Sequence, residues 1–482
     1  MTTGRRDTRT RDVLAVAIVL SAAYGCGMLL DWFKPGVDDS VPLVGIGEPV
    51  KVWPFDLVRA CVVASWGLAL VTWALARLRP PVVARPAMLA DNGRSLKLAT
   101  AAVLLLPFLI RPVAVLGGNL VQTAICVPST AFAFWAITRM QRYRRMPARL
   151  PAAAFAWGGF VAVGFGAAMN SWLDQYGMAY LVDVFDLLRD PASAVGEMRT
   201  ARALNAALFE ELGKAAGIAV VYFGFRRHID GLVSGLVLGA AIGLGFNFSE
   251  SVLYMGEYGT GVSAYQYWLR QSVGLFAAHV ALTAVVGAAF GVARQLRGRR
   301  RRTRVVACGF VVAVTGHFTV NALAAHMLRA TDALFGDNPW LANLVGTPLT
   351  VIVLQGPVVV LYLLLLRRGL RAQAGAMAVE LPLEVRTGYG AITTDEVSAL
   401  QRPARRFFVT VKALRNGGFP AYRHLRRLHA AQFDLAAQRW HRSRGEVDPW
   451  SPAEALLRDR VLRLKDEGAR TTPVPPAAEV ES

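Results

Sequence analysis

The sequence is poor in charged residues and lacks the zinc-protease signature His-Glu-x-x-His. Only 18% of its 482 residues are charged, compared with about a quarter in an average soluble domain. Hydrophobic residues make up 54% of the chain, so they must be gathered in long apolar runs. This composition excludes an ordinary soluble globular domain and predicts a protein that crosses a membrane repeatedly.

The sequence also has few cysteines, four in 482 residues. No two cysteines have Cys-x-x-Cys spacing, and each lies in an apolar run; they are Cys26, Cys61, Cys126 and Cys308. We interpret them as small buried hydrophobic residues. The sequence therefore indicates neither a disulfide framework nor a cysteine-bound metal.

Ten apolar runs are long enough to span a bilayer, which takes about 20 residues. They cover 13–31, 57–77, 98–116, 118–138, 152–172, 201–225, 231–255, 268–293, 304–328 and 344–366. Prolines, glycines and Arg111 interrupt the third and fourth runs, so this pair is expected to be a hairpin or a re-entrant pair. No Ala-x-Ala-like cleavage site precedes Asp31, so we expect the first span to stay uncleaved.

The loops between the runs alternate in charge, with arginine-rich loops separated by acidic or neutral ones. The positive-inside rule then places every basic loop, and both termini, in the cytoplasm of a multi-pass protein of the bacterial plasma membrane. The net charge of +20 is explained by these loops and by attraction to the anionic lipid bilayer. No nucleic-acid partner is needed.

The predicted fold class is an all-α polytopic transmembrane helix bundle of about ten spans with a small helical cytoplasmic tail. We expect N-terminal transmembrane helices over 1–150, a transmembrane core over 151–370 and a basic tail over 371–482. Two capping boxes support helices in the tail, one from Thr393 to Glu396 and one from Ser451 to Glu454.

Ionisable residues inside spans are costly and usually functional. The sixth run contains Glu210, Glu211 and Lys214, with Glu210 and Lys214 on one helix face. Two adjacent carboxylates beside a lysine suit a general base. A buried ion pair that locks the bundle is the structural alternative.

The next three spans add further candidates. Glu250 follows Phe246 by one turn near the end of the seventh run, where a solvated interfacial glutamate is the alternative. His279 and His317 lie in the eighth and ninth runs, and each could simply hydrogen-bond a neighbouring helix. In the seventh run, the spacing of Gly235, Gly239 and Gly243 predicts a close helix contact.

If the spans are straight helices, three of these candidates lie at a similar depth in the membrane. With a rise of ~1.5 Å per residue, Glu210, His279 and His317 lie ~14–17 Å below the outer surface, whereas Glu250 is shallower. Zinc binds histidine nitrogen and carboxylate oxygen and keeps one position for water in catalytic sites. Because His-Glu-x-x-His is absent, the usual zincin arrangement is excluded.

Four motifs in order on successive spans resemble those of the PrsW family of intramembrane proteases. They are Glu210-Glu211-x-x-Lys214, Phe246-x-x-x-Glu250, His279-x-x-x-Thr283-x-x-x-Gly287 and His317-x-x-x-Asn321. The resemblance covers roughly 150–370 and implies a membrane-embedded, metal-dependent peptidase related to the CAAX-prenyl protease and bacteriocin-processing group. One departure is Ser251, where the family commonly has Asn.

The resemblance also implies roles and partners. The catalytic residues would be Glu210, Glu211, His279, His317 and Asn321. A divalent metal, with zinc expected, would be bound by Glu211, Glu250, His279 and His317. The related prenyl proteases suggest a metal-free alternative, in which a glutamate activates water and His317 with Asn321 stabilises the oxyanion. The substrate would be a membrane protein, with an anti-sigma factor as the best-known example.

Two other functions fit the same residues. A transporter or channel could use intramembrane Glu, Lys and His as a proton or ion relay, although we find no inverted repeat to support it. A non-catalytic scaffold whose tail binds a partner is the third possibility. Loss of proteolysis in a Glu210 variant would distinguish the protease from both.

Overall fold

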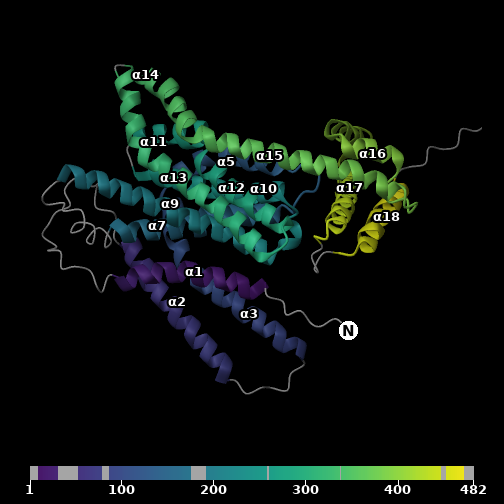
Figure 1. The fold of residues 1–482 in the computed structure, drawn as a ribbon, viewed down its shortest axis with the longest axis horizontal. Helices are drawn as coiled ribbons and strands as arrows, with labels where there is room; N and C mark the ends of the chain where they lie inside the picture. The colour runs from purple at the N-terminus through teal and green to yellow at the C-terminus, as the bar shows by residue number, and fades with distance from the viewer. Residues whose placement is uncertain are drawn as a thin grey trace, which may run out of the picture. The chain divides into compact units, whose positions relative to one another are not determined.

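The computed structural model describes residues 9–30, 53–78, 86–174, 191–257, 260–336, 338–446 and 452–471. Within these ranges the chain is helical, with turns and short connections and no strand (Figure 1). It forms two compact units, which are considered separately. The first comprises Met1–Thr138 and Pro147–Leu365, and the second comprises Arg139–Met146 and Leu366–Ser482.

The first unit begins with five α-helices and a short 3-10 turn. These are α1 (Arg9–Leu30), α2 (Trp53–Leu78), α3 (Pro86–Leu105), η2 (Leu106–Leu109), α4 (Ile110–Gly118) and α5 (Leu120–Arg139). The prolines and glycines predicted to interrupt this region produce the 3-10 turn at η2 and a break at Asn119. The region therefore contains two consecutive apolar helical segments, as the two predicted runs required.

The remainder of the first unit carries all the candidate site residues. Its elements are α6 (Arg149–Ala156), η3 (Trp157–Ala162), α7 (Val163–Trp172), α9 (Pro191–Gly224), η5 (Arg226–His228), α10 (Leu232–Glu257), α11 (Thr260–Tyr267), η6 (Trp268–Val273), α12 (Ala278–Gln295), α13 (Arg299–Phe335), α14 (Pro339–Leu341), η7 (Ala342–Gly346) and the first part of α15 (Thr347–Val385). The segments η3, η6 and η7 are π-helical.

Nine segments of the described chain are long and apolar enough to cross a membrane. The helix α9, which contains the sixth predicted span, is not among them although it has 34 residues. Glu210, Glu211 and Lys214 place three charges within its apolar stretch. The chain is thus a multi-pass all-α membrane protein, and α9 differs from the nine spans in carrying three charged residues close together in its apolar stretch.

The predicted eighth span is not one straight helix. It divides into η6, a turn at Gly274 and α12, which begins at Ala278. The ninth and tenth spans lie in longer helices than expected, since α13 has 37 residues and α15 has 39. The prediction that all four cysteines are buried is wrong, because Cys26 and Cys308 are exposed. Both are on helices that cross the membrane, where an exposed apolar side chain faces lipid.

The helix α10 lies at the centre of the first unit, and glycines let it approach its neighbours closely (Figure 1). A Cβ added at Gly239 would lie 2.2 Å from the backbone oxygen of Thr283, and one at Gly243 would lie 2.2 Å from that of His279. The predicted close contact of the glycine run is therefore confirmed, and its partner is α12. The backbone of His279 is fixed directly against α10.

The second unit contains the end of α15, α16 (Thr394–Gln401), α17 (Pro403–Ser443) and α18 (Glu454–Thr471). The capping box at Thr393 is confirmed, because the Glu396 carboxylate accepts from the Thr393 backbone N–H at 2.8 Å. The second predicted box begins at Ser451, which lies outside the described residues, and α18 begins at Glu454. A small apolar core that includes Leu381, Leu400 and Phe433 holds these helices together.

Candidate active site

The helix α9 brings two carboxylates and an ammonium into the interior of the first unit. Glu211 and Lys214 are fully buried, and Glu210 is 6% exposed. Lys214 Nζ lies 2.9 Å from Glu211 Oε1 and 3.7 Å from Glu210 Oε2. Its ammonium also lies 3.8 Å from the centre of the Phe246 ring, a cation–π contact. One lysine therefore balances two glutamates.

His317, from α13, is oriented by Glu211. Its Nδ1 lies 3.0 Å from Glu211 Oε1, and its Nε2 lies 3.7 Å from Glu210 Oε2. A carboxylate accepts hydrogen bonds, so Nδ1 carries the proton of that bond. The lone pair of Nε2 in the neutral imidazole then points toward Glu210, the arrangement by which a carboxylate prepares a histidine for a metal.

His279, in the first turn of α12, connects the α9 charges with Glu250 of α10. Its Nε2 lies 2.6 Å from Glu250 Oε2, and its Nδ1 lies 2.8 Å from Lys214 Nζ. Because an ammonium only donates, Nδ1 accepts and Nε2 donates to Glu250. The rings of His279 and His317 are 5.2 Å apart between centres in an edge-to-face arrangement.

Glu250 has a second partner that the sequence reasoning missed. Arg270, in η6, donates from Nη1 to Glu250 Oε2 at 2.7 Å. Its Nε donates to Gln266 at 2.9 Å, and its guanidinium lies 4.1 Å from the Tyr254 ring centre. Arg270 is the third residue of the predicted span 268–293. A charged residue within an apolar run was the available signal.

The departure at Ser251 has a structural role. Ser251 Oγ accepts from Gln271 Nε2 at 2.9 Å and donates to the Asn247 backbone oxygen at 2.6 Å. Gln271 Oε1 in turn accepts from Ser129 and Thr130 of α5. Ser251 thereby fastens η6 to α10, next to the Arg270–Glu250 pair.

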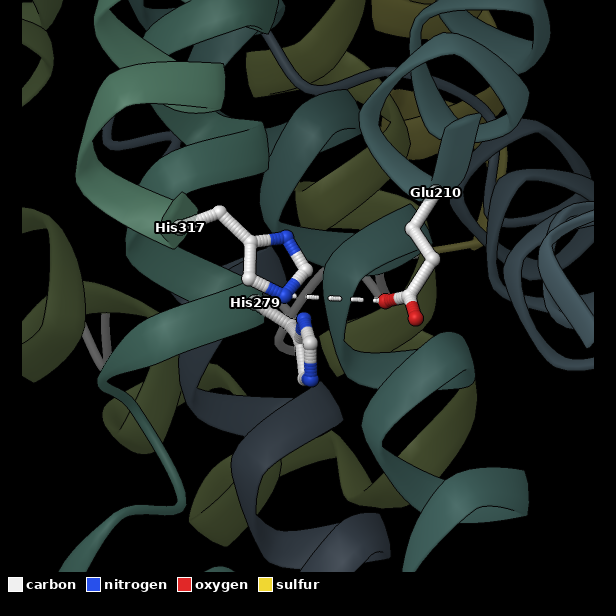
Figure 2. A group of neighbouring side chains, drawn as sticks. All are labelled: Glu210, His279 and His317. Atoms are coloured by element: carbon white, nitrogen blue, oxygen red, sulfur yellow. Dashed lines mark ion pairs between the residues drawn. The ribbon is translucent and has the colours of Figure 1, made fainter. Parts of the chain in front are cut away.

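Glu210 is held differently from Glu211. Its Oε1 accepts from Asn170 Nδ2 at 3.1 Å, and Asn205 Nδ2 donates to Asn170 Oδ1 at 2.9 Å. Its Oε2 is buried and has no hydrogen-bond partner among the described residues. Figure 2 shows this carboxylate turned toward His317 and His279. A carboxylate oxygen without a hydrogen bond is free to accept from a ligand or to bind a cation.

The donor set suits a divalent metal. Glu210, His279 and His317 each offer one ligand atom, and these atoms lie within 4.8 Å of one another, with all three residues buried. One carboxylate and two imidazoles are a common set for catalytic zinc, in which a fourth position stays open. The Lys214 ammonium contacts the same donors at His279 Nδ1 and Glu210 Oε2, so it would compete with the metal for them.

The structure brings Glu210, Glu211, His279 and His317 together in one buried cluster. The alternative of a solvated glutamate at Glu250 is wrong, because Glu250 is 9% exposed and contacts His279. His279 lies in the first turn of α12, after the turn at Gly274. Thr283 is also buried.

The remaining predicted residue, Asn321, does not join this group. It lies one turn beyond His317 on α13, and its side chain is exposed. Its role in stabilising an oxyanion, and the individual roles of the other site residues, stay predictions.

The comparison with known families agrees with the motifs. Residues 146–360 match the model of the PrsW family intramembrane metalloproteases. No curated protein and no solved structure matches the chain. The match places this segment in the PrsW family and confirms the resemblance. It implies a peptide-bond hydrolase that acts within a membrane and uses a divalent metal.

Proposed function

We propose that the buried cluster of Glu210, His279 and His317 is the centre that hydrolyses a peptide bond in a membrane-associated protein. The observation that carries the proposal is the convergence of their three donor atoms within 4.8 Å, on helices α9, α12 and α13. A carboxylate also contacts the opposite nitrogen of each imidazole, Glu250 for His279 and Glu211 for His317. Such carboxylate–histidine pairs are typical of metal centres.

In this proposal Glu210, His279 and His317 would hold the metal, while Glu211 and Glu250 orient the imidazoles. Glu211 and Glu250 are the ligands that the sequence suggested, but each already accepts from a histidine and from Lys214 or Arg270. When bound, a divalent metal supplies Lewis-acid activation of water or of the scissile carbonyl. Zinc is the metal that the donor set favours.

Proton transfer would depend on the carboxylate of Glu210. Its Oε2 lacks a hydrogen bond and faces the imidazole of His317. Such an oxygen can hold a metal or accept a proton from the attacking water, and both roles require a carboxylate rather than an amide. Lys214 pairs with Glu211 beside it at 2.9 Å.

The decisive test is the Glu210→Gln variant, which keeps the side-chain size and removes the carboxylate. We expect peptide-bond cleavage to fall by at least about a hundredfold, in the range of lost acid–base catalysis, while membrane insertion is unchanged. Glu197→Gln is the matched control, because Glu197 lies on α9 but is exposed.

The double variant Glu210→Gln with Lys214→Met separates catalysis from structure. If Glu210 were only a counter-charge for Lys214, neutralising Lys214 as well would restore proteolysis. If Glu210 is the base or a ligand, both variants stay inactive. Metal analysis of the purified variants then distinguishes these two roles, since only loss of a ligand should lower the bound metal.

We also propose an anti-sigma factor as the substrate and a cytoplasmic position for both termini. The resemblance supports the first, and the alternation of loop charge supports the second. Comparing the membrane proteome of a deletion strain with that of the parent would reveal the substrate. Reporter fusions at Arg145 and after Arg371 should both read cytoplasmic, and an external result at either would contradict the orientation.

A further inference from the structure

A separate cavity of about 790 Å³ lies among α1, α9, α12 and α13. Most of its wall is apolar and includes Val16, Leu20, Ala215, Ala219, Phe290 and Phe310. Glu210, Glu211, His279 and His317 do not line it. The cavity is therefore distinct from the candidate active site, although α9, α12 and α13 contribute to both.

One end of this cavity is cationic. Arg226, Arg299 and Arg302 line it, and Asp12 is the one acidic residue of its wall. The Arg226 guanidinium lies 5.3 Å from the Tyr222 ring centre, and its Nε is buried without a hydrogen-bond partner among the described residues. An unpaired buried donor of this kind is suited to an anionic ligand.

The chain directions explain why the arginines meet. The helix α9 ends just before Arg226, and α13 begins at Arg299. No side chain caps the first turn of α13, so its free N–H groups add to the positive potential of Arg299 and Arg302. Two helix ends thus contribute cations to the same mouth of the cavity.

We propose that this cavity binds one anionic phospholipid. Its phosphate would contact Arg226, Arg299 and Arg302, and an acyl chain would lie along the apolar wall. Basic pockets between transmembrane helices are known to take such headgroups, and the volume is within the range of about 300–1,000 Å³ for small-ligand sites.

The test compares two lipids with identical chains, phosphatidylglycerol and phosphatidylcholine, added to the purified full-length protein. Native mass spectrometry counts the bound lipids. We expect a clear preference for phosphatidylglycerol, which Arg226→Gln or Arg302→Gln lowers by about fivefold. Arg227→Gln is the matched control, because Arg227 is exposed and does not line the cavity.

A second variant tests the apolar part. Ala219→Phe adds a ring to the wall, so it should reduce binding of both lipids without changing the preference. The measurement is made in the Glu210→Gln background as well, so its result does not depend on proteolysis. A melting temperature for each variant confirms that it is folded, and Arg302→Gln replaces Arg226→Gln if the latter is not.

Three results would overturn the proposal. The first is equal binding of the two lipids by the unaltered protein. The second is an effect of Arg227→Gln as large as that of Arg226→Gln. The third is displacement of phosphatidylglycerol by one equivalent of a neutral transmembrane peptide, which would assign the cavity to a protein helix.

Discussion

Both units of the chain bury carboxylates against cations, and they do so in different ways. In the second unit the Glu384 side chain is fully buried, and both of its oxygens are satisfied. Oε1 accepts from Arg458 at 2.6 Å, and Oε2 accepts from Arg439 at 2.9 Å and Arg458 at 3.0 Å. In the first unit, Glu210 and Glu211 each keep one oxygen without a hydrogen bond.

This difference separates a structural lock from a reactive site. A buried carboxylate that uses both oxygens specifies one packing arrangement and has nothing left to offer a ligand. A buried carboxylate with an unsatisfied oxygen loses hydration without gaining a hydrogen bond, so that oxygen lowers the stability of the fold. The alternative that Glu210 and Lys214 only lock the bundle is weaker than the sequence allowed, because Glu210 and Glu211 each keep a buried oxygen without a hydrogen-bond partner among the described residues.

The first prediction, with the largest expected effect, compares two histidines whose Nδ1 atoms each contact a glutamate. His317 Nδ1 lies 3.0 Å from Glu211, and His441 Nδ1 lies 3.0 Å from Glu446. An asparagine can retain a donor near Nδ1 but removes Nε2. We expect His317→Asn to lower cleavage by at least about a hundredfold, because Nε2 faces Glu210, whereas His441→Asn should leave it unchanged.

Cleavage of a fluorogenic transmembrane substrate in proteoliposomes measures this contrast. Metal analysis of the same samples shows whether His317→Asn also loses the metal. Equal losses of activity in both variants would mean that the histidine–carboxylate pair matters for folding rather than for chemistry, and the comparison between the units would fail.

The second prediction concerns Glu384→Gln, which leaves Arg439 and Arg458 without their buried counter-charge. Removing one partner of a buried pair costs about 3–5 kcal/mol, and partial exposure of both arginines should reduce this to about 2–3 kcal/mol of unfolding free energy. Hydrogen exchange of α17 and α18 in the full-length protein measures the change, and cleavage should be retained.

Asp459→Asn is the control for that measurement. Its ion pair with Arg463 is solvent-exposed on both sides, and exposed pairs contribute about 0–1 kcal/mol. If Asp459→Asn accelerated exchange as much as Glu384→Gln, the burial of Glu384 would not be what stabilises the tail.

The sequence predicted those features of the fold and of the candidate site that follow from residue type and from the spacing of residues along a helix. Hydropathy located the spans, the spacing of Gly239 and Gly243 predicted a close helix contact, and charge inside apolar runs identified the site. It could not predict that η6 and α12 are separate, because a single glycine such as Gly274 is also tolerated inside a continuous helix. That break brings Arg270 and His279 to Glu250, a tertiary contact with no local signature.

The third prediction tests the close contact between Gly243 of α10 and the backbone of α12. Gly243→Ala would place a methyl group 2.2 Å from the backbone oxygen of His279 and push α12 away from α10. We expect about a tenfold loss of cleavage, since a displacement of about 1 Å can cost up to a hundredfold. Gly375→Ala, in the second unit, meets nothing within 4 Å and should be harmless.

A steady-state assay together with the melting temperature distinguishes misplacement from unfolding. Gly243→Ala protein that remains folded but turns over slowly would support positioning of His279 by the α10 backbone. Full activity of the variant would show that α12 can shift without affecting the site.

The smallest effect is a pH dependence confined to the second unit. Burial, followed by the nearby charge of Arg406, lowers the pKa of His429 from 6.5 to about 4. The folded tail therefore keeps His429 neutral where the unfolded chain would protonate it. Its stabilising contribution is complete above pH 6.5 and is lost as the pH falls toward 4. At pH 5.5 the loss is about 1.4 kcal/mol. Exchange of α17 amides at pH 7 and 5.5, corrected for intrinsic rates, measures it. His429→Leu should remove this component of the slope, and an unchanged slope would assign the pH sensitivity to another group of the tail.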